Sequence, residues 1–344
     1  MAGEAHVRGD FVGGRVSAPF FAAFFPGQLS EKPGMGEAFA DHYDFVSAWF
    51  EAVSRRSGID LATTFFGAGS PARHDDRPAQ VGVFAVSVAA LDVLERIHGL
   101  VPGAAAGYSL GTFAAFVAAG ALDRLAALDI LLTLNRLLEE ERLAGRDRPG
   151  GMGFVIGLPR TELEEVVQDV RRMRGLGEES LSIGTENAVR QFVLTGEGAA
   201  VEAAVERAGP NALKTGMLPL AWSMHSQRLD GVPRRLRILL EGKTAIRTPK
   251  RPLYAPMFGR RISSLEELSS VLLSQISRPA RWAQTLSTMG EDGFSLFAEA
   301  GPGDVLTKLL LWTLRNARGF VVEDPESASA FARAMTAPVA VPHA

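Results

Sequence analysis

The sequence predicts an α/β protein built from two structural units, and three segments carry this prediction. The apolar run APFFAAFFPGQ (18–28) has the length of a strand covered on both faces, as in a parallel sheet, and ends at Pro-Gly. The segment GAAAGYSLG (103–111) combines a strand, a tight turn and the start of a helix. Between residues 149 and 218, the order strand–helix–strand–strand–helix–strand indicates a ferredoxin-like unit inserted into the larger one.

The remaining elements follow from the periodicity of apolar residues. Residues 35–56, 79–97 and 113–143 have helical spacing, the last with a break near Gly120. A polar loop at 144–151 separates these helices from the inserted unit. Within that unit we expect strands at 152–158, 182–196 (two strands around a turn) and 212–220, and helices at 161–176 and 198–209.

These assignments give the domain boundaries. The large unit is expected to be discontinuous, over 18–148 and 219–325, and the small unit covers 149–218. Residues 326–344 are rich in Ala, Pro and Ser, so we expect a loose tail there.

Composition excludes several classes of function. With 47% hydrophobic and 22% charged residues, the 344-residue chain fits a globular enzyme, and a net charge of −3 gives no case for nucleic-acid binding. The absence of cysteine removes disulfides, thiolate catalysis and Cys-ligated metal, and we expect no metal site. The first residues lack the apolar core of a signal peptide, and polar residues interrupt runs such as 81–94. We therefore expect a cytoplasmic protein without a membrane span.

Ser109 lies in the pattern G-x-S-x-G, between Gly107 and Gly111. After a strand and before a helix, this pattern is typical of the nucleophile elbow in α/β-hydrolase-like sheets, where a strained turn presents the serine Oγ. The amide of Leu110 could then donate to a developing oxyanion from a helix N-terminus. The pattern alone is weak because Gly, Ser and Ala are common here, and the alternative is that Ser109 is simply a helix N-cap.

A nucleophilic serine needs a base, and His225 is the candidate among six histidines. It follows an apolar strand in LPLAWSMHSQRLD (218–230). A lone histidine is usually a structural group, and the other five lie at expected termini, on solvated helices or in a loop: His6, His42, His74, His98 and His343.

Seven motifs in register over about residues 20 to 315 carry a family resemblance. FFPGQLSEKPGMG (24–36) is similar to F-P-G-Q-G-S-Q-x-x-G-M-G, GYSLG (107–111) to G-H-S-L-G, and LPLAWSMHS (218–226) to L-P-V-S-x-x-F-H-S. The chain thus resembles the malonyl-CoA:acyl-carrier-protein transacylases and the related polyketide-synthase acyltransferases. The other matching segments are GGMGFVIGL, TENAVRQFVLTG, QISRPARW and EAGPGDVLTKLL.

The resemblance implies a role for each matched residue. Ser109 would be the acylated nucleophile and His225 its general base, oriented by the backbone carbonyl of Gln275. The backbone amides of Gln28 and Leu110 would form the oxyanion hole. Acyl groups would arrive on phosphopantetheine thioesters of acyl carrier protein or coenzyme A, with no permanently bound cofactor.

One departure from the family bears on the substrate. Malonyl-specific members have an arginine on the helix after the elbow that binds the substrate carboxylate, and Leu134 occupies its place here. Arg136 lies two positions later, about 200° around a helix, and would reach in only through a local bulge. Because a buried carboxylate without a partner is costly, we expect a substrate other than malonyl or methylmalonyl.

Further departures reshape the expected pocket. Tyr108 replaces the family's histidine, and Leu29 and Glu31 replace its glycine and glutamine. Trp222 and Met224 precede the histidine and suggest an apolar, adaptable wall, although both could equally be core residues. Asn187, from the TENAVRQFVLTG motif, completes the expected pocket.

A basic run at 234–251 is a candidate docking surface for acidic carrier proteins. An ordinary solvated basic helix is an equally good explanation. The residues expected to contribute are Arg234, Arg235, Arg237, Lys250 and Arg251.

The sequence therefore predicts a stand-alone, monomeric acyltransferase that moves a non-carboxylated acyl group onto or between acyl carrier proteins. Three alternatives remain open: an editing hydrolase that releases acyl groups to water, a malonyl transacylase despite Leu134, and an inactive carrier-binding scaffold.

Overall fold

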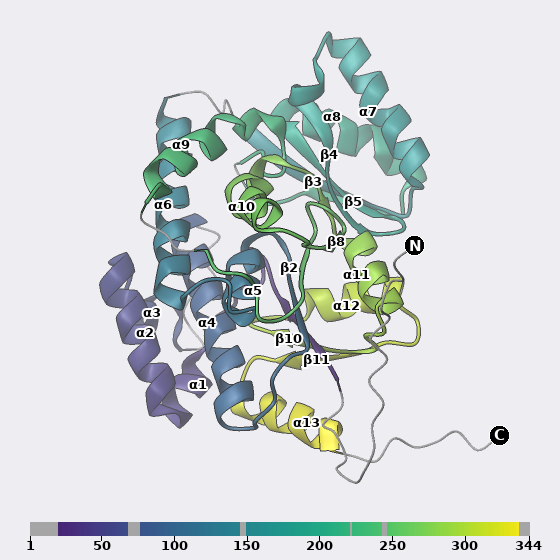
Figure 1. Ribbon diagram of the computed structural model, residues 1–344. Coiled ribbons are helices and arrows are strands. Elements are labelled where there is room, and N and C mark those ends of the chain that lie inside the picture. Colours follow the sequence, from purple (N-terminus) through teal and green to yellow (C-terminus); the bar gives the residue numbers. More distant parts are fainter. Residues whose placement is uncertain (1–19, 68–75, 145–148, 221, 243–245, 337–344) are drawn as a thin grey trace, which may run out of the picture.

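The computed structural model describes residues 20–67, 76–144, 149–220, 222–242 and 246–336, and two sheets organise it (Figure 1). The larger sheet has the strand order β11-β10-β1-β2-β7-β8. Its strands pair in parallel except β8, which is antiparallel to β7. The strands are β1 (Ala22–Phe25), β2 (Ala104–Gly107), β7 (Leu253–Ala255), β8 (Arg260–Arg261), β10 (Leu296–Ala300) and β11 (Arg318–Val322).

Helices cover both faces of the larger sheet, as the continuous apolar strands predict. In β1, Ala22 and Phe24 pack with α11 and α12, whereas Ala23 and Phe25 belong to the cluster on the opposite face with α4, α5 and α6. The helices of this unit are α1 (Glu37–His42), α2 (Asp44–Ser57), α3 (Leu61–Phe65), α4 (Asp76–Arg96), α5 (Thr112–Ala118), α6 (Arg124–Leu143), α9 (Gly231–Leu240), α10 (Leu265–Ser274), α11 (Trp282–Glu291), α12 (Val305–Thr313) and α13 (Pro325–Thr336).

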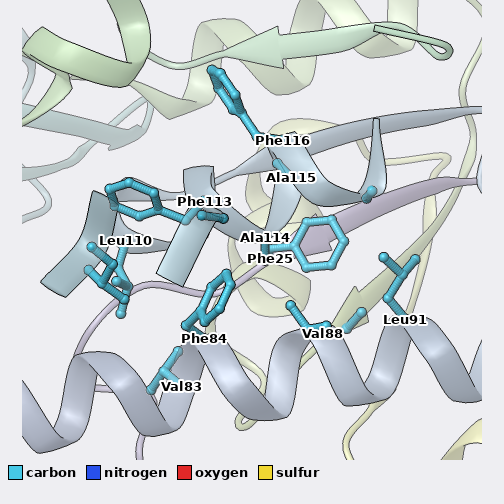
Figure 2. Close-up of a cluster of buried hydrophobic side chains, with 14 of the residues drawn as sticks. Phe25, Val83, Phe84, Val88, Leu91, Leu110, Phe113, Ala114, Ala115 and Phe116 are labelled. Carbon is cyan, nitrogen blue, oxygen red and sulfur yellow. The ribbon is translucent and has the colours of Figure 1, made fainter. Parts of the chain in front are cut away.

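Helix α4 is the core helix beneath the nucleophile elbow. Figure 2 shows Val83, Phe84 and Val88 of α4 directed toward Phe25 and Phe113, which come from β1 and α5. By length and composition, its residues Arg77–Arg96 could also cross a membrane, contrary to the expectation from polar interruptions, but 89% of its most apolar stretch is buried inside the protein.

The second sheet has the order β6-β3-β5-β4-β9 and the ferredoxin-like connectivity that the sequence predicts (Figure 1). Helices α7 and α8 cover one of its faces, where Val155, Leu163 and Val201 share a hydrophobic cluster. Its elements are β3 (Gly150–Ile156), α7 (Arg160–Arg174), β4 (Leu181–Ala188), β5 (Gln191–Glu197), α8 (Gly198–Ala208) and β6 (Lys214–Met217), joined by β9 (Ala280–Arg281) from the larger unit.

Successive side chains of the second sheet alternate between the face that α7 and α8 cover and the opposite, open face. Along β3, Gly153 lies so close to α8 that an added Cβ would stand 2.5 Å from Val205, whereas Phe154 points to the other side. In β4, a register shift between Ile183 and Thr185 moves the chain from the helix-covered face to the open one.

The structure corrects two expectations about the helices. The tail expected over 326–344 is not loose throughout, because Pro325–Thr336 form helix α13, which buries Phe331 and Met335; residues 337–344 lie outside the described part. The single helix expected at 35–56 is divided at Tyr43, whose extended backbone ends α1 and begins α2.

Candidate active site

Ser109 follows β2 on a tight turn and has a left-handed backbone with φ of 52°. The flanking glycines are required by close backbone approach. A Cβ on Gly107 would lie 2.2 Å from the backbone of Gly111, and one on Gly111 would lie 2.0 Å from the carbonyl oxygen of Phe25. The turn therefore has the strained geometry expected of a nucleophile elbow.

His225 lies against Ser109, with 2.9 Å between Nε2 and the serine Oγ. Its Nδ1 is 3.0 Å from the carbonyl oxygen of Gln275 and 3.1 Å from that of Arg278. Carbonyl oxygens only accept hydrogen bonds, so Nδ1 carries the proton and Nε2 is left as the acceptor for the serine hydroxyl. The Gln275 carbonyl lies where the resemblance implies, and the Arg278 carbonyl is a second partner that the sequence analysis missed.

Burial determines the protonation state of this histidine. His225 is 3% exposed, and burial lowers its pKa below the ordinary value, against the opposing effect of the two carbonyl contacts. A neutral imidazole with a free Nε2 lone pair can accept the serine proton, so Ser109 and His225 together can carry out nucleophilic acyl chemistry.

The segment after β1 forms the other side of the site. Gln28 lines the same cavity as Ser109, and its side-chain oxygen accepts from Gln80 at 3.3 Å. Leu110 is buried in the 3₁₀ turn Ser109–Gly111, directly after the serine. Gln28 thus lines the cavity that holds Ser109 and Leu110 follows the serine in the chain, and an oxyanion hole formed by their amides stays a prediction.

A cavity of about 350 Å³ opens above Ser109 and His225. The open face of the second sheet forms its wall, and three predicted pocket residues, Tyr108, Asn187 and Met224, line it. The Tyr108 hydroxyl donates to Asn187 Oδ1 at 2.8 Å, which links the elbow to β4. Burial raises the pKa of Tyr108, so its hydroxyl remains protonated as a donor.

Two predicted pocket residues lie elsewhere. Leu134 and Trp222 are 3% and 4% exposed, belong to the hydrophobic core, and are not among the residues that line the cavity. The sequence placed Leu134 by alignment, which does not determine side-chain direction. Arg136, one position beyond the buried Asn135, is exposed and faces away from the core, as its helical spacing predicts.

Sequence reasoning missed most of the apolar wall. The alternation in GGMGFVIGL was the available signal, because every second residue of a strand shares a face. Lys214 is the one cation among the described lining residues; it is exposed, with Nζ 5.8 Å from the Phe154 ring centre. The missed apolar residues are Met152, Phe154, Ile156, Val193, Leu218 and Leu220, together with Val305 and Leu306 of α12.

Two arginines of the basic run are already engaged in ion pairs within the protein. Arg235 forms ion pairs with Glu140 and Glu141, and Arg251 forms one with Glu95. The exposed cations Arg234, Arg237 and Lys250 remain at the surface, and residues 243–245 lie outside the described part.

Within the described ranges, no cluster of three or more His, Asp or Glu side chains could hold a metal ion.

Comparison with known proteins identifies the family. The acyl transferase domain model matches residues 24–338. The chain is 30% identical over 315 residues to the malonyl CoA-acyl carrier protein transacylase of Haemophilus influenzae, covering 90% of this chain and 97% of that one. It is 25% identical over 307 residues to the transacylase of the same name from Bacillus subtilis, covering 89% and 94%.

A solved structure agrees with these sequence relatives. The malonyl-transacylase in complex with its type II polyketide-synthase acyl-carrier protein superimposes with a TM-score of 0.84 at 26% identity, covering 92% of this chain and all of that one. With a family match over most of the length and a serine–histidine pair at the predicted positions, this chain belongs to the acyl transferase domain family and is an acyltransferase.

Proposed function

We propose that this acyltransferase moves a non-carboxylated acyl group, held as an ester on Ser109, onto or between the phosphopantetheine thiols of acyl carrier proteins. The observation that carries the proposal is the wall of the cavity: apolar side chains dominate it, and no arginine is among its described lining residues. A neutral acyl chain gains from burial against such a wall, about 0.8 kcal/mol for each methylene.

The reaction follows from the geometry of the pair. Ser109 Oγ attacks the thioester carbonyl carbon while its proton passes to His225 Nε2, 2.9 Å away. The amides of Gln28 and Leu110 stabilise the tetrahedral oxyanion. When the C–S bond breaks, the leaving sulfur takes the proton from His225, and the acyl group stays on the serine as an ester.

The second half-reaction reverses these steps with a new thiol. His225 accepts the proton of the incoming thiol, the sulfur attacks the ester carbonyl, and Ser109 Oγ leaves with that proton. The carbonyls of Gln275 and Arg278 hold the imidazole in the tautomer that both halves need. Met224, Tyr108 and Asn187 would contact the acyl-thioester in the cavity.

Carrier proteins are the proposed partners because the relatives are named as acyl-carrier-protein transacylases and one is solved with its carrier protein. Arg234, Arg237 and Lys250 would provide the docking charge, with Arg235 and Arg251 contributing less because each is already paired. We further propose that the enzyme acts as a cytoplasmic monomer without a permanently bound cofactor.

Malonyl transfer is the competing function, and the names of the relatives favour it. The residues of this chain oppose it. Among its described lining residues the cavity has no arginine, and the one cation, Lys214, is exposed and adjoins the Phe154 ring. A carboxylate left without a buried partner costs on the order of 3–5 kcal/mol, which corresponds to roughly two to four decades in rate or affinity.

Competitive acylation tests the choice between them. The enzyme is mixed with equimolar malonyl-CoA and butyryl-CoA, and the adduct on Ser109 is identified by intact mass, with Ser109→Ala as the blank. We expect the butyryl adduct to exceed the malonyl adduct by about a hundredfold or more. A malonyl adduct that forms first would overturn the proposed substrate class. Adding holo acyl carrier protein then shows whether the acyl group transfers to the carrier or is lost to water, the outcome expected of a hydrolase.

A further inference from the structure

The turn that follows β1 holds a leucine in a conformation that leucine avoids. Leu29 has φ of 72°, and among the described residues only Ser109 and His225 are other non-glycine residues with positive φ. All three line the active-site cavity. Side chains with a Cβ resist this left-handed region, and such strain gathers at functional sites where the surrounding structure enforces it.

A carboxylate enforces it here. The backbone amide of Leu29 donates to Glu31 Oε2 at 2.7 Å, and Glu31 is only 6% exposed. Because the accepting oxygen is buried, water competes little for this hydrogen bond. Ser30, which lies between these residues, donates its hydroxyl to the Gly27 carbonyl at 2.7 Å and closes the same turn.

This contact acts on the neighbouring residue. The amide that Glu31 holds belongs to the peptide group between Gln28 and Leu29, so fixing its direction also limits the backbone of Gln28. We propose that Glu31 is a positioning residue that keeps Leu29 left-handed and thereby aims the Gln28 amide at the oxyanion. The proposal rests on the function proposed above, in which that amide stabilises the tetrahedral intermediate.

The strain at Leu29 allows the role of Glu31 to be tested with a double-mutant cycle. Glycine adopts positive φ without steric cost, so a glycine at position 29 needs no carboxylate to hold it. Removing Glu31 should therefore slow acylation while leucine is at position 29, and it should change the rate little once glycine is there. A purely structural role for Glu31, such as filling space, would give the same loss in both backgrounds.

The experiment measures single-turnover acylation by butyryl-CoA in four proteins: wild type, Glu31→Ala, Leu29→Gly and the double variant. We expect Glu31→Ala to slow acylation at saturating substrate by at least about tenfold, since losing one oxyanion donor costs a hundredfold or more. In the Leu29→Gly background the same substitution should cost less than about threefold. Equal losses in the two backgrounds, or no loss in Glu31→Ala, would overturn the proposal.

Two further variants keep the test decisive if Glu31→Ala unfolds. Glu31→Gln retains an acceptor oxygen and should slow acylation less than the alanine. Leu29→Val, whose branched Cβ resists positive φ more strongly, should slow acylation with Glu31 intact. A Leu29→Val enzyme that is acylated as fast as wild type would contradict the proposed role of Glu31.

A matched control and a change of substrate separate this proposal from the function itself. Lys32→Ala removes the 2.6 Å ion pair with Glu323 from the same segment and should leave the acylation rate unchanged. If wild type prefers malonyl-CoA, the substrate proposal fails, and the same ratios measured with malonyl-CoA still decide the role of Glu31.

Discussion

The two sheets contribute to the site in different ways. The larger sheet presents the nucleophile on a short turn after β2, and the backbone is strained at both reacting residues, with φ of 52° at Ser109 and 61° at His225. The second sheet contributes one face of its strands β3 and β5, whose side chains Met152, Phe154 and Val193 form a wall. Reaction chemistry thus depends on backbone conformation, whereas substrate choice depends on side-chain packing, and substitutions in the two regions should have separable effects.

The largest expected effect comes from the parallel sheet. Ser109→Ala should abolish the covalent adduct for every acyl-thioester, and His225→Ala should slow its formation by about 10²–10⁴. Intact-mass measurement after mixing gives the adduct, and thermal unfolding checks that both variants stay folded. An acyl-enzyme of normal amount in Ser109→Ala would remove the proposed mechanism.

Lowering the pH should slow acylation by protonating His225. Because burial lowers its pKa below the ordinary value near 6.5, the neutral base persists to lower pH than in a solvated histidine. The pH profile of acylation should therefore have its midpoint below 6.5, and the rate should fall about tenfold per unit beneath that midpoint. A midpoint at or above 6.5 in single-turnover profiles would contradict this reading of the burial.

A substitution on the second sheet should discriminate between substrates instead of stopping the reaction. Phe154→Ala should slow acylation by octanoyl-CoA about tenfold, since a buried aromatic contact is worth roughly 1.5–3 kcal/mol, and should affect acetyl-CoA less. Val189→Ala is the matched control, because Val189 lies in the turn after β4, is 73% exposed and does not line the cavity. Equal losses for both chain lengths would place Phe154 outside the acyl path.

The smallest effect is expected outside both sheets, on α9. Reversing the exposed charges with Arg234→Glu and Arg237→Glu should raise the KM for carrier protein several-fold, and less so for a free pantetheine acceptor. Arg55→Glu on α2, whose side chain is 71% exposed, is the control. A KM that stays constant and insensitive to salt would leave α9 as an ordinary solvated helix.

Part of this arrangement could be predicted from the sequence. GYSLG predicted the elbow because its glycines are dictated by backbone contact, and the alternating strands and helices of 149–218 predicted the second unit. The sequence could not predict that Leu134 faces the core and not the cavity, because the direction of a helical side chain depends on tertiary packing, which an alignment does not give. Helix α13 was hidden by its Ala and Ser content, although the spacing of Ala328, Phe331 and Met335 was a usable signal.

Two contacts that hold the His225 segment were not predicted from the sequence. Thr195 of β5 donates to the carbonyl of Met224 at 2.7 Å, directly before the histidine, and the Arg278 carbonyl lies 3.1 Å from the histidine Nδ1. The two residues of each contact lie 29 and 53 positions apart along the chain, so no local pattern joins them.

The short strand β9 determines how an isolated fragment of the second unit should behave. Ala280 and Arg281 pair in parallel with Thr185 and Glu186, so one border of the second sheet is closed by chain that returns more than sixty residues after that sheet's last strand. A fragment limited to 149–218 would leave this border of β4 bare, with unpaired amides and carbonyls ready to recruit a strand from another molecule. Such a fragment should self-associate, and supplying the 275–282 segment as a fused or separate peptide should suppress that association.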